Sequence, residues 1–392
     1  MIAVLSPLRK ALRPATAVAA ALTLAACDPV SLPGGNTGPT VNPAKPTTVA
    51  LLLPKSDAEA GAVARDMENA ARLALTKFPD AKIDLKVYDT GGIAATAGAQ
   101  AQLAVDEGAK IIIGPLRADA VNAAGLAVVD EGVNVLGFSN NPTIAGGNVF
   151  ILSPTFANTA NRLMSYAKKQ GKGSVVVVHS NDVSGQFGKL AVEQAAASNG
   201  VSVLSSEGYD LSIQGVTNTA RNAGRVISSG QADSVFITTE AANAAMPMLL
   251  TQLPEAGAAP ESVQYIGLTR WDVKPEIFSQ RGAEGAWFTL PSQSQQAAFN
   301  ASYGASYGAS PNPLASVAYD GVTAVATLLQ SGSKEALTAA ELTRSSGFNG
   351  ASGLFRLKAD GTTQRALSVA TIRNQKVEVL DPAPSRFTGA GF

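Results

Sequence analysis

TTVALLLP, at residues 47–54, is the stretch of sequence that decides the fold. It is apolar on both faces of a strand, and residues 57–78 after it have the length and the amphipathic pattern of a helix. The same pairing of an apolar strand with a helix recurs at 83–89 (IDLKVYD), 94–107, 109–115 (AKIIIGP), 118–131 and 133–139 (VNVLGFS). Strands that are apolar on both faces and alternate with helices predict right-handed βαβ units on a parallel sheet with helices on both sides.

A second series of strands and helices follows the first. Strands are predicted at 148–154, 174–180, 201–207, 232–239 and 263–267, and helices at 156–170, 186–199, 216–229 and 241–253. The segments after Gly285, expected to cross back between two lobes, are a strand at 286–291, a helix at 313–330 and short strands near Leu354, Val369 and Val377. The predicted fold class is therefore α/β, with two doubly wound parallel-sheet lobes.

The predicted domain boundaries follow from this pattern. Residues 47–380 are expected to form the two-lobed domain, followed by a tail at 381–392. Lobe 1 is predicted to comprise about 47–155 and 288–345, and lobe 2 about 156–287 and 346–380.

The residues before the domain indicate export and lipid anchoring. Positive charges followed by a short apolar run are the layout of a signal peptide at 1–26. It ends in LAAC (24–27), which resembles the lipobox of bacterial lipoproteins, so Cys27, the only cysteine, is predicted to be lipidated. Residues 27–46 are rich in Pro and Gly and predict a flexible tether. We expect the protein on the periplasmic side of a bacterial membrane. Asp28 resembles the signal that keeps lipoproteins of enteric bacteria in the inner membrane, which favours that membrane, with the outer membrane as the alternative.

Composition excludes several classes of function. Lys plus Arg and Asp plus Glu are 30 each, so no basic footprint indicates a nucleic acid as partner. His179, the single histidine, ends an apolar strand and is interpreted as a core or crevice-edge residue. No nucleophile turn, metal-ligand set or phosphate-binding glycine motif accompanies it, so we predict no catalytic residue, metal or cofactor.

Two open α/β sheets place a ligand crevice at the carboxyl ends of their strands. In this chain the loops at those ends are 54–56, 88–89, 114–118, 137–141, 180–187, 238–240 and 267–272. If a ligand site exists, these loops should line it. Arg270 and Trp271 can clamp or stack on a ligand there, but they fit a lobe contact or a surface hot spot equally well.

Several motifs, in order, resemble the type I periplasmic binding proteins of the leucine/isoleucine/valine-binding family. They are VALLLP (49–54), IIIGPLRADA (111–120), VLGFSNNP (135–142), FILSPTFANTANRL (150–163), VVVHSNDVSGQFGKLA (176–191) and GFNGASGLFRLKADG (347–361). The resemblance covers residue 47 to about 379 and implies two lobes with hinge crossovers that close on a small polar ligand, amino-acid-like or peptide-like, as for ABC uptake or sensing.

The resemblance also implies positions for the site. The first-lobe serine of the family falls near Ala118, the ligand loop on Ser139 and Asn140, the aromatic residue on Phe187 and the acidic residue near Thr269. No carboxylate occupies the place of Thr269, although Glu240 is close by in the predicted crevice. The predicted ligand-binding residues are Ser56, Leu116, Arg117, Ala118, Ser139, Asn140, Phe187, Glu240, Thr269, Arg270 and Trp271.

A second group with this fold is also similar to the chain. The opening segment 49–75 resembles that of the lipoprotein activators of penicillin-binding proteins, which stimulate peptidoglycan synthases through surface contact. Two hypotheses therefore remain open: a binding protein for a small polar ligand, and an activator whose partner is a peptidoglycan synthase. We expect no enzymatic activity, and a monomer, in either case.

Overall fold

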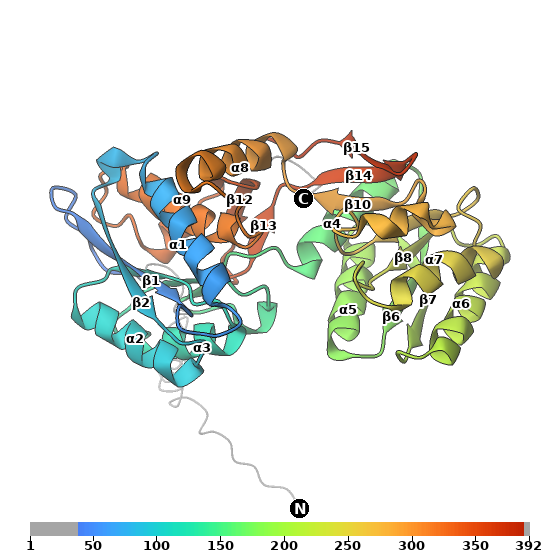
Figure 1. Cartoon of the computed structure of the whole chain (residues 1–392), viewed down its shortest axis with the longest axis horizontal. Helices are drawn as coiled ribbons and strands as arrows, with labels where there is room; N and C mark the ends of the chain where they lie inside the picture. The colour runs from blue at the N-terminus through green and yellow to red at the C-terminus, as the bar shows by residue number, and fades with distance from the viewer. Residues whose placement is uncertain (1–37, 388–392) are drawn as a thin grey trace, which may run out of the picture.

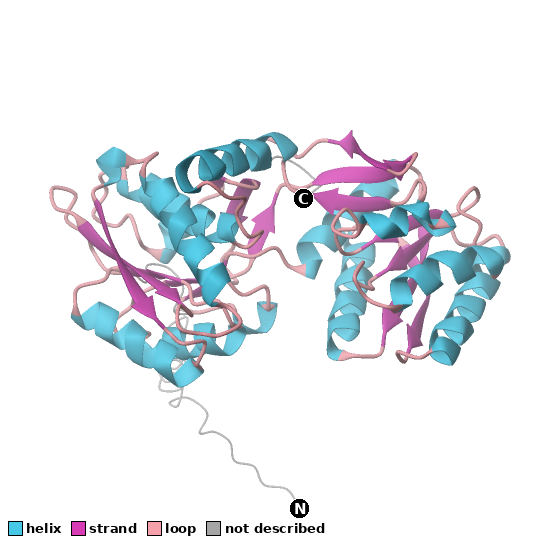
Figure 2. Ribbon diagram, in the orientation of Figure 1, coloured by secondary structure: helices cyan, strands magenta, loops and turns pink. Residues whose placement is uncertain are grey.

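The computed structural model describes residues 38–387, which form two lobes joined by segments that pass between them (Figure 1). The predicted signal peptide at 1–26, Cys27 and the tether up to residue 37 lie outside the described residues. Each lobe has a central sheet with helices on its faces, as Figure 2 shows, and this confirms the predicted fold class. Within residues 38–387, no helix is both long enough and apolar enough to span a membrane.

Lobe 1 is built on a five-stranded parallel sheet with the order β2-β1-β3-β4-β5. The strands are β1 Thr47–Leu53, β2 Ile83–Asp89, β3 Ile111–Ile113, β4 Val135–Gly137 and β5 Val149–Ile151. The helices on it are α1 Gly61–Leu75 and α9 Ala315–Leu329 on one face, and α2 Ala94–Asp106 and α3 Ala118–Ala127 on the other. Alternate side chains of β1 enter the two cores, Leu51 on one face and Leu52 on the other, which explains its unbroken apolar sequence.

Lobe 2 has a seven-stranded sheet with the order β15-β14-β10-β9-β8-β6-β7. Its strands are β6 Ser174–Ser180, β7 Ser202–Tyr209, β8 Ser234–Ile237, β9 Gln264–Gly267, β10 Trp287–Leu290, β14 Ser368–Arg373 and β15 Lys376–Asp381. Its helices are α4 Phe156–Lys169 and α5 Val183–Ser198 on one face, and α6 Ile213–Ser228 and α7 Ala245–Glu255 on the other. The two last strands are antiparallel to their neighbours, so they close one edge of an otherwise parallel sheet.

Capping residues decide where two helices of lobe 2 begin. The Asp182 side chain accepts a hydrogen bond from the backbone N–H of Gly185 at 2.7 Å, and Ser212 does the same for Gly215 at 3.0 Å. These N-caps start α5 and α6 three residues earlier than the apolar pattern predicts, because a cap satisfies N–H groups of the first turn that have no partner within the helix.

The strand pairing departs from the predicted lobe boundaries in two places. Strand β10 pairs with β9 and β14, so residues 287–290 belong to the sheet of lobe 2. The region 346–380 divides: its first part is a small antiparallel sheet on lobe 1, with β11 Phe348–Gly350, β12 Gly353–Leu357 and β13 Thr363–Arg365, and its second part is β14 in lobe 2. Phe348 and Phe355 hold the small sheet on lobe 1, because both rings are buried in the core under α9.

Two further segments differ from the sequence prediction. The end of the predicted tether is packed on lobe 1: Val41 is buried in its core and donates its backbone N–H to the carbonyl oxygen of Lys334 at 2.9 Å. A helix that the sequence did not predict, α8 Gln293–Tyr307, lies on lobe 1 beside α1. The remaining short helices are α10 Ala339–Leu342 and 3-10 turns at Pro79–Ala81, Pro142–Ile144, Pro275–Ser279 and Arg281–Ala283.

Candidate functional site

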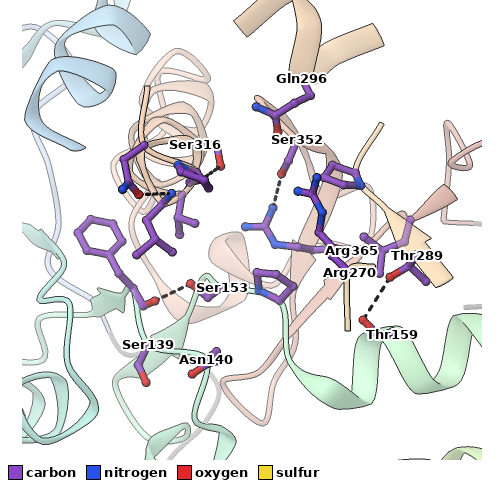
Figure 3. A pocket seen from close by; sticks show the side chains of 18 of the residues that line it. Ser139, Asn140, Ser153, Thr159, Arg270, Thr289, Gln296, Ser316, Ser352 and Arg365 are labelled. Carbon is purple, nitrogen blue, oxygen red and sulfur yellow. Dashed lines mark hydrogen bonds between the residues drawn. The ribbon is translucent and has the colours of Figure 1, made fainter. Parts of the chain in front are cut away.

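A cavity of about 830 Å³ lies between the two lobes, next to the segments that pass between them. On the side of lobe 1, its residues come from the carboxyl ends of β3 and β4, from α8, the start of α9 and the small sheet. On the side of lobe 2, they come from α4, β10 and the loop after β9, and the segments between the lobes complete the wall, as Figure 3 shows in part. They are Leu116, Arg117, Ala118, Phe138, Ser139, Asn140, Asn141, Ser153, Pro154, Thr159, Arg270, Thr289, Leu290, Pro291, Gln296, Asn300, Pro311, Asn312, Pro313, Leu314, Ser316, Val317, Ser352, Leu354, Arg365 and Leu367. Parallel strands direct their carboxyl ends to one edge of the sheet, so several loops converge here.

The loop after β4 forms the polar floor of the cavity. The Ser139 hydroxyl accepts a hydrogen bond from the backbone N–H of Asn141 at 3.1 Å, which leaves its own proton for another acceptor. The Ser153 hydroxyl donates to the carbonyl oxygen of Phe138 at 2.5 Å. This bond ties the loop to the first crossing segment, residues 152–155, in which the chain passes from β5 of lobe 1 to α4 of lobe 2. The loop is thus fixed from both sides, and Ser139 and Asn140 are held at the cavity (Figure 3).

Arg365 lines the cavity and forms a buried ion pair with Asp320, which lies behind the wall. The guanidinium Nη1 donates to Asp320 Oδ2 at 2.6 Å and to the Ser352 hydroxyl at 2.9 Å, and Nε donates to the carbonyl oxygen of Leu152 at 3.0 Å. The side chains of Arg365 and Asp320 are 5% and 0% exposed. Burial raises the pKa of the Asp320 carboxyl above its ordinary value, and the adjacent Arg365 charge opposes that shift.

Two other arginines reach the cavity from opposite lobes. Arg117, the residue before α3, is paired with Asp57 at 2.8 Å. The backbone N–H groups of Ala60 and Glu59 hold the pKa of Asp57 below its ordinary value, and Arg117 lowers it further. On the lobe 2 side, Arg270 Nε donates to the carboxylate of its neighbour Asp272 at 3.0 Å.

The structure divides the predicted site residues into two groups. Those that line the cavity are Leu116, Arg117, Ala118, Ser139, Asn140 and Arg270. Those that do not are Ser56, Phe187, Glu240, Thr269 and Trp271. The first group comes from loops at the carboxyl ends of strands on the cavity side, as the topology predicts, and their contact with a ligand stays a prediction.

Trp271 lies in the core of lobe 2 instead of the crevice. It is 0% exposed, and its ring stacks on that of Phe288 with centroids 6.4 Å apart. Gly267 leaves room for the indole, because a Cβ at that position would come within 2.3 Å of Trp271 Nε1. A large aromatic ring next to an apolar strand gains more from burial than from exposure, and this corrects the expected ligand contact.

The other predicted residues that do not line the cavity lie on the loops and helices next to the strand ends. The Ser56 backbone N–H donates to Asp89 Oδ1 at 3.2 Å, and the Thr269 hydroxyl donates to the carbonyl oxygen of Thr239 at 3.3 Å. Phe187 is 42% exposed on α5, and Glu240 is exposed. His179 is buried, with Nδ1 2.8 Å from the Ser180 carbonyl oxygen, as expected of a core or crevice-edge residue. In the described part of the chain, no group of three or more His, Cys, Asp or Glu residues could hold a metal ion.

Sequence reasoning missed much of the cavity wall on the side of lobe 1. Gln296 and Asn300 lie on α8, whose mixed polar and small sequence gives no apolar stripe. Ser352 and Arg365 belong to the hairpin region that had been assigned to lobe 2. The one signal near Arg365 is the hairpin segment 347–361, which resembles that of the leucine/isoleucine/valine-binding proteins and ends four residues before it.

Comparison with known proteins now decides the family. Residues 46–376 match a family model described as periplasmic binding protein. The chain belongs to the periplasmic binding protein family. This confirms the resemblance inferred from the motifs and places the protein in the periplasm. No curated protein matches this periplasmic binding protein significantly in sequence.

Solved structures share the fold of this periplasmic binding protein. A protein assigned to a branched-chain amino acid ABC transporter of Rhodospirillum rubrum superposes with a TM-score of 0.71 at 20% identity, covering 86% of this chain and 100% of its own. A branched-chain amino acid periplasmic ligand-binding protein of Burkholderia xenovorans gives 0.67 at 15% identity, covering 86% and 96%. A substrate-binding protein of Desulfitobacterium hafniense in complex with leucine gives 0.60 at 20% identity, covering 86% and 100%. At identities of 15 to 20%, the likeness to these proteins establishes the fold.

Proposed function

We propose that this protein is a non-enzymatic, lipid-anchored binding protein that takes up a small polar ligand between its two lobes, for ABC uptake or for sensing. The observation that supports this most directly is the cavity of about 830 Å³ at the carboxyl ends of the lobe 1 strands. Its volume is in the range of ligand sites, about 300 to 1,000 Å³, and its wall combines apolar side chains with a few convergent polar groups.

The crossing segments support closure of the lobes by a hinge motion. The chain passes between the lobes after β5, after β10 and after β13. Two of these passages contain a proline that lines the cavity, Pro154 and Pro291. A ligand that contacts both lobes stabilises the closed arrangement by its differential affinity for the two states.

Thermal unfolding of the full chain, purified in detergent, tests ligand binding. The panel contains amino acids, short peptides and peptidoglycan fragments. A ligand at 100 times its dissociation constant adds about 2.7 kcal/mol to the free energy of unfolding, which is a shift of several degrees. Ser139→Ala should reduce the shift, because Ser139 lines the cavity, whereas exposed Ser279→Ala should leave it unchanged. No shift with any compound would contradict the proposal.

The lipid anchor at Cys27 has its own test. We expect the mature chain to begin at Cys27 with acyl chains attached, which mass spectrometry of the N-terminal peptide measures. Cys27→Ser should release the protein from membranes, whereas Ser31→Ala should not. A released wild-type chain that begins elsewhere would contradict the anchor and leave ligand binding untouched.

A second candidate function is activation of a peptidoglycan synthase by protein contact. The observation that favours it is an exposed apolar stripe on α5, formed by Val183, Phe187 and Leu190, which are 74%, 42% and 48% exposed. These residues share one helix face by their spacing. Crosslinking from position 187 in cells should capture a penicillin-binding protein if this candidate is right, and position 221, on the opposite side of the lobe 2 sheet, serves as control. Equal yields at both positions would count against it.

A further inference from the structure

The wall of the cavity carries arginines and no carboxylates. Arg117, Arg270 and Arg365 line it, and among the described residues that line it none is Asp or Glu. The other polar groups of the wall are amides and hydroxyls, such as those of Asn140 and Ser139. Guanidinium groups recognise carboxylates with charge-assisted, directional hydrogen bonds.

The acidic partners of these arginines lie outside the wall and are already engaged. The pairs are Arg117 with Asp57, Arg270 with Asp272, and Arg365 with Asp320. Oδ1 of Asp57 accepts from two backbone N–H groups and Oδ2 accepts from Arg117. Both oxygens of Asp272 accept from Arg270. An ammonium group in the cavity would therefore find no carboxylate to compensate its charge, and burying an uncompensated charge is expensive.

Two of the three guanidinium groups still have N–H donors to offer. Within residues 38–387, Arg117 Nε and Arg270 Nη1 have no hydrogen-bond acceptor. Their side chains are 44% and 43% exposed. Arg117 belongs to lobe 1 and Arg270 to lobe 2, so an anion that binds both donors also draws the two lobes together.

The rest of the wall is apolar. Leu116, Phe138, Leu290, Leu314 and Val317 face the same space. A small inorganic anion would leave this surface in contact with water, whereas an organic acid with a hydrocarbon part would bury it.

We infer that the cavity binds an organic carboxylate with an apolar body and without an ammonium group. This inference rests on the proposed function and narrows its ligand class. Glu240, the acidic residue predicted at the crevice, is exposed and does not line the cavity.

Titration calorimetry of the full chain in detergent, with matched pairs of compounds, tests the inference. The pairs are leucine with 4-methylpentanoate, phenylalanine with 3-phenylpropanoate, and glutamate with glutarate, which differ in each case only by the amine. We expect the best acid to bind about tenfold or more tightly than its amine-bearing partner. An amino acid that binds as tightly as its partner acid, or more tightly, overturns the inference and leaves the proposed function intact. No binding of any probe here and in the thermal panel overturns both.

Substitutions of the two arginines test whether they bind the carboxylate of the ligand. Arg117→Gln and Arg270→Gln should each weaken binding of the best acid by about tenfold, because each removes a charge-assisted hydrogen bond. Arg281→Gln is the matched control: Arg281 lies in lobe 2, pairs with exposed Glu261 and does not line the cavity. Glu240→Gln should also leave the affinity for the acid unchanged. Unchanged affinity in both test variants, or a tenfold loss in Glu240→Gln, overturns the inference.

Discussion

In each lobe, one arginine donates a hydrogen bond to a backbone carbonyl oxygen of a crossing segment. The acidic partners of these two arginines differ in how deeply they are buried. Arg365 of lobe 1 donates to the carbonyl oxygen of Leu152 in the first crossing segment and pairs with Asp320, which is 0% exposed. Arg162 of lobe 2 donates to the carbonyl oxygen of Leu367 in the third crossing segment, at 2.7 Å, and pairs with Asp381, which is 38% exposed.

The difference indicates that the crossing segments are attached more firmly to lobe 1 than to lobe 2. Removing Asp320 leaves the Arg365 charge at a place that water does not reach. The Arg162 side chain is buried too, at 6% exposed, but water can take the place of the Asp381 carboxylate. The lobe 1 end of the crossing segments should therefore be the fixed end, and the cavity is built mainly on that lobe.

The largest expected effect comes from Asp320→Asn. It leaves the Arg365 charge buried without its carboxylate, so we expect a loss of about 3 to 5 kcal/mol in the free energy of unfolding, measured by urea denaturation. Glu378→Gln is the control, because its pair with Arg373 is exposed and should contribute less than about 1 kcal/mol. A similar small loss in both variants would remove the proposed difference between the lobes.

Replacing both partners separates the charge from the packing. The double variant Asp320→Leu with Arg365→Met removes the ion pair without leaving a lone charge, so it should recover part of the loss seen in Asp320→Asn. Recovery should be incomplete, by about 1 to 3 kcal/mol, because the Leu152 carbonyl oxygen loses its donor. Full recovery in urea denaturation would show that this carbonyl contact contributes nothing.

A smaller effect is expected in lobe 2. Asp381→Asn should lower the free energy of unfolding by about 1 kcal/mol or less, since water reaches the carboxylate and Arg162 keeps its bond to Leu367. The comparison between the lobes fails if this loss in urea denaturation equals that of Asp320→Asn.

The smallest change in the free energy of unfolding is expected for a substitution in the exposed apolar stripe of α5. Phe187→Ser should change the free energy of unfolding by less than about 0.5 kcal/mol, because the ring is 42% exposed. Trp271→Ala, its buried aromatic counterpart in lobe 2, should cost about 3 to 5 kcal/mol in the same measurement. A large loss in Phe187→Ser would assign the stripe to folding instead of contact with a partner.

Much of the fold could be predicted from local sequence. The strands 83–89 and 174–180 have the predicted bounds, because the first alternates apolar and polar residues, the second is built on four consecutive valines, and turn residues flank both. Helix α8 escaped prediction because its sequence is mostly Gln, Ser, Ala and Gly. Phe299 and Tyr303 are buried by contacts with residues of α1, of α9 and of the small sheet, which are distant in sequence. Local pattern also could not assign 348–365 to a lobe, since a short apolar strand fits either core.

In the candidate site, too, local sequence predicts some of the residues and not others. Arg117 and Ser139 follow strands of lobe 1, so the rule that loops meet at the carboxyl ends of parallel strands predicts their place at the cavity. Arg365 comes from a hairpin far along the chain and reaches the wall only through its contacts with Asp320 and Leu152.

The sequence by itself determined the two α/β lobes, the family and the loops that border the crevice, because these depend on apolar periodicity and on motifs that are local in the chain. Only the tertiary structure decided which residues share the cavity, that Trp271 is core, and that the arginines of the wall have their acids outside it. Those facts depend on pairings between residues far apart in sequence, whose energies are set by burial and by the partner that each polar group finds.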